Sequence, residues 1–141
     1  MAPAMTRISG ILETALYCAD IAKSADFYRR LFGFRPLLES DRLIALDVAG
    51  RNVLLLFKAG ATKEPAESAG GVIPPHGASG PSHLAFSIGT EDLAPWEKQL
   101  TAAGVSIEST VNWPGGAKSI YFRDPDEHLV ELLTPGFWSI Y

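Results

Sequence analysis

Hydrophobic residues recur along the chain with strand-like and helix-like spacing, in the same order in each half. In the first half, the pattern predicts a helix at 22–32 and strands at 11–18, 35–39, 43–48 and 53–57. In the second half, it predicts a helix at 91–103 and strands at 82–88, 105–111, 119–122 and 129–133. Both halves therefore have the order β-α-β-β-β, and a glycine, Gly33 or Gly104, ends each helix.

The repeat divides the chain into two modules within a single domain of residues 1–141. Module one is expected at about 8–58 and module two at about 81–135. The linker, at about 59–80, is rich in Gly, Ala, Pro and Ser, and we expect a long loop there. The tail, 136–141, is apolar and is expected to pack on the domain or on a partner subunit. The predicted fold class is α+β, with pseudo-twofold symmetry between the modules.

Composition and charge limit the kinds of molecule that the protein is expected to bind. The formal net charge of −4 gives no support for a nucleic-acid groove or for binding to an anionic membrane surface. No apolar run is long enough to span a bilayer. A single cysteine, Cys18, excludes an internal disulfide, and its place in an apolar strand favours a buried, inert thiol. We expect a cytoplasmic protein.

Three polar residues lie among apolar neighbours on predicted strands: Glu13, His83 and Glu131. If the first strands of the two modules face each other, Glu13 and His83 come together, with Glu131 on a neighbouring strand. One imidazole and two carboxylates suit a divalent metal ion such as Zn, Mn, Ni or Fe, and three protein ligands leave positions for substrate. The same pattern also fits a solvent-facing Glu131 and a hydrogen-bonded core His83.

Several motifs resemble the vicinal oxygen chelate superfamily, which includes glyoxalase I, fosfomycin-resistance thiol transferases, extradiol dioxygenases and bleomycin-binding proteins. The resemblance runs from Ile11 to about Pro135. The residues that carry it are Asp20, 24–28 (SADFY), Gly33 with Phe34, 83–86 (HLAF), 121–126 (YFRDPD) and 128–131 (HLVE). The later motifs are most similar to the fosfomycin-resistance and glyoxalase branch. The resemblance implies that the modules form a cupped mixed sheet around a metal.

By this resemblance, His83 and Glu131 match two usual metal ligands, and Glu13 takes a place where many members have His. The implied function is a glyoxalase-like lyase, isomerase or transferase acting on a small oxygen-bearing substrate, with Glu131 or Glu13 as a catalytic base. A metal-free, bleomycin-type drug-binding protein is the alternative, and an extradiol dioxygenase is the third. No carboxylate lies near Leu54. A four-ligand glyoxalase site is therefore not expected.

Three further residues are candidates for contact with a substrate. Tyr121 matches a substrate-contacting tyrosine of the fosfomycin-resistance group, and Trp113 is expected to line an apolar pocket with it. His76 follows two prolines and is a candidate ligand or proton shuttle. No Arg or Lys follows Glu131, which disfavours an anionic phosphonate substrate. We expect a homodimer, and the sequence leaves open whether Glu13 meets His83 of its own chain or of a partner.

Overall fold

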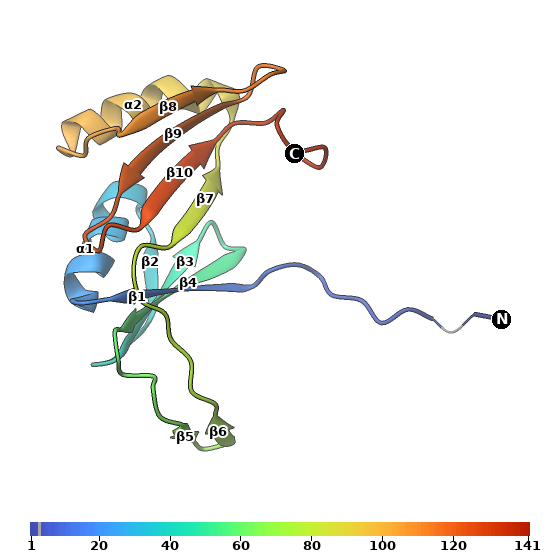
Figure 1. The fold of residues 1–141 in the computed structure, drawn as a ribbon, viewed down its shortest axis with the longest axis vertical. Helices are drawn as coiled ribbons and strands as arrows, with labels where there is room; N and C mark the ends of the chain where they lie inside the picture. The colour runs from blue at the N-terminus through green and yellow to red at the C-terminus, as the bar shows by residue number, and fades with distance from the viewer. Residues whose placement is uncertain (3) are drawn as a thin grey trace.

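The computed structural model describes residues 1–2 and 4–141, and the strands form two four-stranded sheets and a small hairpin (Figure 1). The first module contains β1 (Glu13–Cys18), α1 (Ile21–Phe32), β2 (Arg35–Glu39), β3 (Leu43–Val48) and β4 (Asn52–Lys58). The second contains β7 (His83–Ser87), the 3-10 turn η1 (Thr90–Asp92), α2 (Leu93–Ala102), β8 (Ser109–Asn112), β9 (Lys118–Arg123) and β10 (Leu129–Leu133).

The two sheets have the same topology. Their strand orders are β1-β4-β3-β2 and β7-β10-β9-β8. In each sheet the first strand of the module pairs in parallel with the last strand, and the other neighbours are antiparallel. This equivalence confirms the predicted mixed α+β fold and the internal repeat of two βαβββ modules.

The ends of α1 follow from local sequence. Asp20 has extended backbone, and its carboxylate accepts a hydrogen bond from the Lys23 N–H, which satisfies one free donor of the first turn. Gly33 ends the helix with a φ of 72°, and its N–H donates to the Arg29 carbonyl. A residue with a Cβ is strained at that φ, so glycine is favoured there.

Two segments differ from the prediction. The linker contains a short hairpin, β5 (Ala66–Ser68) and β6 (Gly71–Ile73), which extends from one end of the molecule (Figure 1). Strands of three residues are too short to show an alternating pattern. The strand predicted at 105–111 begins only at Ser109, because Val105 and Ile107 pack against the core from an irregular segment.

One hydrophobic core joins the modules. Helix α1 contacts β3 and β4 of its own sheet and also packs on the second sheet. The ring centroids of Phe32 and Phe86 lie 4.9 Å apart, and those of Phe27 and Phe122 lie 6.5 Å apart. The helix-facing sides of both sheets are thus covered, and the opposite sides stay open. Within the described residues, no helix has the length and apolar character needed to cross a membrane.

Candidate functional site

Glu131 lies in the middle of β10 on the open face of the second sheet. Strand alternation directs Val130 and Leu132 into the core, where both are fully buried, and turns Glu131 to the other side. Glu131 is nevertheless only 7% exposed. On the neighbouring strand β7, the Nε2 atom of His83 lies 3.2 Å from Oε1 of Glu131. The structure therefore brings these two predicted ligands together.

The contact made by the other ring nitrogen of His83, Nδ1, determines which nitrogen of a neutral ring carries the hydrogen. Nδ1 lies 2.9 Å from the carbonyl oxygen of Leu129, and a carbonyl only accepts, so Nδ1 carries the hydrogen. A neutral His83 then points the Nε2 lone pair at a carboxylate, which is repulsive unless a proton or cation lies between them. Two ligands at right angles, each about 2.1 Å from one ion, are about 3 Å apart. The pair thus fits a divalent metal.

The other carboxylate oxygen of Glu131 is held by neighbouring side chains. The Ser119 hydroxyl donates a short hydrogen bond to Oε2, and the Trp113 indole N–H donates to the Ser119 oxygen at 2.8 Å. Tyr121 lies opposite Glu131 in the β9–β10 register, with its ring centroid 6.3 Å from that of His83. Burial raises the pKa of Tyr121, and the negative charge of Glu131 raises it further. The phenol therefore stays a hydrogen-bond donor at neutral pH.

Glu13 and His76 lie on the open face of the first sheet. They line one cavity of about 720 Å³, whose remaining walls are mostly apolar and include the Arg42 side chain. His76 is fixed there, because its Nδ1 is hydrogen-bonded to the Tyr17 hydroxyl and its ring packs edge-on against Phe57 at 4.7 Å. The positions of β4 that share this face with Glu13 are Val53, Leu55 and Phe57, so this cavity wall offers no fourth carboxylate.

The predicted site residues consequently form two groups. His83, Glu131, Tyr121 and Trp113 belong to the second sheet and the loop beside it, whereas Glu13 and His76 belong to the first sheet. Among the described residues, the ligand atoms of Glu13 do not gather with those of His83 and Glu131 within 4.8 Å. A single chain therefore supplies two ligands at one place and the third at another.

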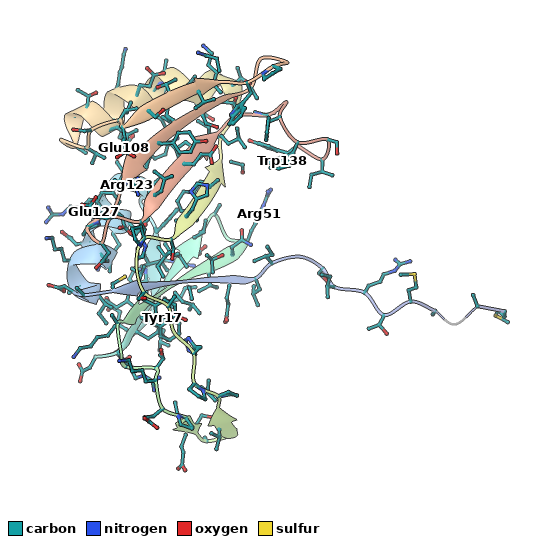
Figure 2. All side chains as sticks on the ribbon, in the orientation of Figure 1. Tyr17, Arg51, Glu108, Arg123, Glu127 and Trp138 are labelled. Carbon is teal, nitrogen blue, oxygen red and sulfur yellow. The ribbon has the colours of Figure 1, made fainter. Side chains whose placement is uncertain are left out.

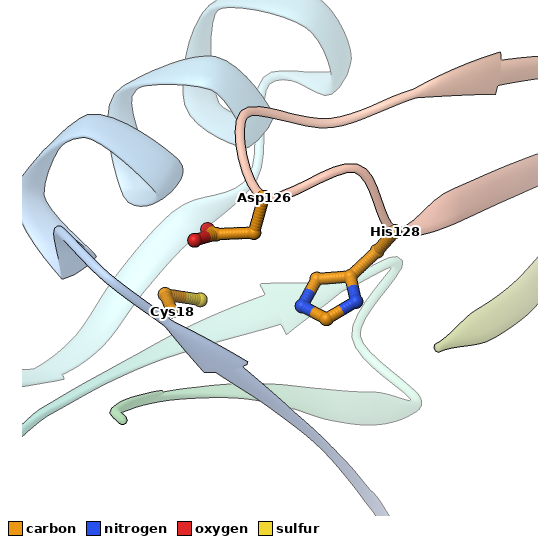
Figure 3. Close-up of side chains that lie close together, drawn as sticks. All are labelled: Cys18, Asp126 and His128. Atoms are coloured by element: carbon orange, nitrogen blue, oxygen red, sulfur yellow. The ribbon is translucent and has the colours of Figure 1, made fainter. Parts of the chain in front are cut away.

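A different cluster does bring three ligand types within 4.8 Å of one another: Cys18, Asp126 and His128 (Figure 3). Its polar atoms already have partners in the protein. The Asp126 carboxylate accepts from the Ala19 N–H and from the Ser24 hydroxyl, each at 2.8 Å. Burial raises the pKa of the Cys18 thiol to about 12, so it carries no charge at neutral pH.

His128 has both ring nitrogens engaged as well. Nδ1 accepts the Ser82 N–H at 2.8 Å, so Nε2 carries the hydrogen and donates to the Tyr17 carbonyl at 2.9 Å. This buried imidazole joins β1 to the β9–β10 turn and to the end of the linker. The cluster is thus a structural connection between the modules. No local pattern in the sequence indicates it, because Cys18 lies more than a hundred positions before its partners.

The same turn contains a buried carboxylate, Asp124. Its oxygens accept from the Tyr28 hydroxyl at 2.8 Å and from the N–H groups of Asp126 and His128 at 2.9 Å. Burial raises the pKa of Asp124 above its usual value, and these donors act in the opposite direction. The Asp124 carboxylate therefore binds a proton more readily in the folded protein than in the unfolded chain. Its contribution to the free energy of unfolding becomes more favourable as pH falls through its folded pKa.

Replacing Tyr28 by Phe removes one donor from this carboxylate and should lower the free energy of unfolding by about 1–3 kcal/mol at neutral pH. The loss should shrink as pH falls through the pKa of Asp124, because a protonated carboxyl no longer needs that donor. Urea unfolding of parent and variant across an acidic pH series measures both effects. A loss that is independent of pH would show that Tyr28 acts by packing alone.

The chain is similar in sequence and structure to several known proteins. Residues 10–132 match the Glyoxalase/Bleomycin resistance protein/Dioxygenase superfamily. The metallothiol transferase FosB of Bacillus licheniformis is 32% identical over 129 residues, covering 91% of this chain and 77% of the relative. The glutathione transferase FosA of Serratia marcescens is 41% identical over 125 residues, covering 89% and 80%. A crystal structure of lactoylglutathione lyase from Agrobacterium tumefaciens superposes with a TM-score of 0.86 at 32% identity, covering 95% and 99%.

Proposed function

Because the chain belongs to the Glyoxalase/Bleomycin resistance protein/Dioxygenase superfamily, we propose that it is a glyoxalase-like, metal-dependent transferase or lyase acting on a small oxygen-bearing molecule. The observation that carries this proposal is the separation of 3.2 Å between His83 Nε2 and Glu131 Oε1, with the other ring nitrogen of His83 held 2.9 Å from the Leu129 carbonyl oxygen. The similarity to a metallothiol transferase, a glutathione transferase and a lactoylglutathione lyase supports a thiol as a reactant or as part of the substrate.

The metal would be Zn, Mn, Ni or Fe, bound by His83 and Glu131 on the second sheet. Such an ion acts as a Lewis acid that polarises neighbouring oxygen atoms of a bound substrate. Tyr121 stands beside this pair as a protonated hydrogen-bond donor, and the exposed part of Trp113 borders the same face. Glu131 or Glu13 serves as the base that accepts a proton from the substrate.

Glu13 is the third ligand, and we assign it to a second copy of the chain in a homodimer. The cavity around Glu13 has an exposed apolar rim, since Leu37, Leu38 and Ile73 are each at least 50% exposed. If the second sheet of a partner covers this face, the rim is buried and Glu13 approaches His83 and Glu131 of that partner. His76 then faces the substrate from the opposite wall. A cytoplasmic location fits the single, buried thiol.

Metal analysis tests the proposal directly. Protein purified without chelators is expected to contain one divalent ion per chain, and Mn²⁺ added to the metal-free form at 100 times its dissociation constant should raise Tm by roughly 5–10 °C. The metal-loaded form should bind glutathione more tightly than the metal-free form. Absence of metal, with no rise in Tm for Mn²⁺, Ni²⁺ or Zn²⁺, would contradict the proposal and support a metal-free binding protein instead.

A further inference from the structure

We propose that Trp113 and Ser119 are positioning residues for Glu131. Two successive hydrogen bonds, from Trp113 to Ser119 and from Ser119 to Glu131, determine which carboxylate oxygen of Glu131 faces the metal. This inference rests on the proposed function, because it concerns the same carboxylate. It assigns roles to a loop residue at the edge of the sheet and to a strand serine, neither of which is a ligand of the metal.

The direction of both hydrogen bonds follows from the chemistry of the groups. An indole N–H can only donate, so the 2.8 Å contact makes the Ser119 oxygen its acceptor. The Ser119 hydroxyl then has one hydrogen left, and that hydrogen is directed to Glu131 Oε2. Ser119 is fully buried on β9, so water does not compete for this hydrogen. With its acceptor role filled by Trp113, the hydroxyl is held in the orientation that donates to Glu131.

The consequence concerns the two oxygens of Glu131. Oε2 is occupied by the Ser119 hydroxyl, and Oε1 is left facing His83 Nε2. A carboxylate that turned to present both oxygens to one ion would lose the Ser119 hydrogen bond in a buried place, where an unpaired donor is costly. The two residues thus hold Glu131 as a ligand through one oxygen, in the rotamer that a metal beside His83 requires.

The C-terminal tail holds Trp113 in turn. The Phe137 ring packs on the Trp113 indole with centroids 4.4 Å apart, and Trp138 packs on Phe137 at 4.8 Å. Trp138 lies on the segment that follows β10 (Figure 2). The end of the tail is fixed because the Tyr141 hydroxyl donates to the Ile88 carbonyl at 2.7 Å. A backbone bond from the Trp113 N–H to the Ala117 carbonyl holds the loop itself. The indole therefore reaches Ser119 from a supported position.

The test measures Mn²⁺ affinity, by counting unbound Mn²⁺ with electron paramagnetic resonance, for the parent, Ser119→Ala, Trp113→Phe and the double variant. Ser119→Ala should weaken affinity about 10- to 100-fold. Trp113→Phe keeps the ring on Phe137 but removes the N–H, so it should weaken affinity less, because the freed hydroxyl still donates part of the time. The double variant should bind about as weakly as Ser119→Ala alone, since Trp113 acts only through Ser119.

Matched controls separate positioning from general disturbance of the fold. Ser106→Ala alters an exposed serine and should leave the Mn²⁺ dissociation constant unchanged. Ser119→Thr keeps the hydroxyl and should bind more tightly than Ser119→Ala. If Ser119→Ala binds Mn²⁺ as tightly as the parent, or if the losses of affinity add in the double variant, Trp113 and Ser119 do not position Glu131 as proposed. The metal site itself would still stand. Failure of the parent protein to bind Mn²⁺ would contradict both this positioning role and the proposed function.

Discussion

Glu131→Gln should remove tight binding of Mn²⁺ while leaving the fold intact. The amide has the volume of the carboxylate, and its oxygen can still accept the Ser119 hydroxyl, but the charge opposite His83 is lost. Direct ligands matter more than the outer partners, whose loss costs about 10- to 100-fold. We therefore expect affinity to fall by more than about 100-fold, which corresponds to more than about 2.7 kcal/mol of binding free energy.

Titration of the metal-free protein with Mn²⁺ measures this loss, and the melting temperature without metal reports the fold. Glu97→Gln is the matched control, because Glu97 is an exposed carboxylate on α2, away from the open face of the sheet. It should bind as the parent does. If Glu131→Gln keeps the parental affinity, the carboxylate is not a ligand, and its contact with His83 is an ordinary ion pair.

Much of the fold could be predicted because its determinants are local. The βαβββ order follows from hydrophobic spacing, and the end of α1 follows from Asp20 and Gly33, which act on the backbone beside them. The hairpin of β5 and β6 was missed because each strand has only three residues. The contact of His128 with Tyr17 and Ser82 was missed because it depends on how the modules pack, which no local pattern records.

The candidate site also contains residues that the sequence predicts and residues that it does not. His83 and Glu131 are adjacent because their strands pair within one module, and strand alternation places both on the open face. The serine that orients Glu131 has no distinct signal in the sequence, since a serine within a strand is common. Glu13 is the least predictable member, because its distance from His83 depends on how two sheets meet. In a single chain those two sheets share a core on their helix-facing sides.

The assignment of Glu13 to a second copy predicts the other large effect. Glu13→Ala removes the third ligand from each site of a homodimer without touching the pair on the second sheet. We expect tight Mn²⁺ binding to be lost in this variant too, although the altered residue lies in a different sheet from His83 and Glu131. Glu67→Ala, at an exposed carboxylate on β5, is the control and should bind as the parent does.

Combining the two variants in one dimer is the most direct test that the site is shared between chains. Chains with Glu13→Ala and Glu131→Gln are produced together with different affinity tags, and the mixed dimer is isolated and titrated with Mn²⁺. A shared site leaves one complete ligand set in the mixed dimer, so we predict one tightly bound ion there, two in the parent dimer and none in either variant dimer. If the mixed dimer binds no ion while the parent binds two, the three ligands belong to one chain, and the assignment of Glu13 to the partner's site is wrong.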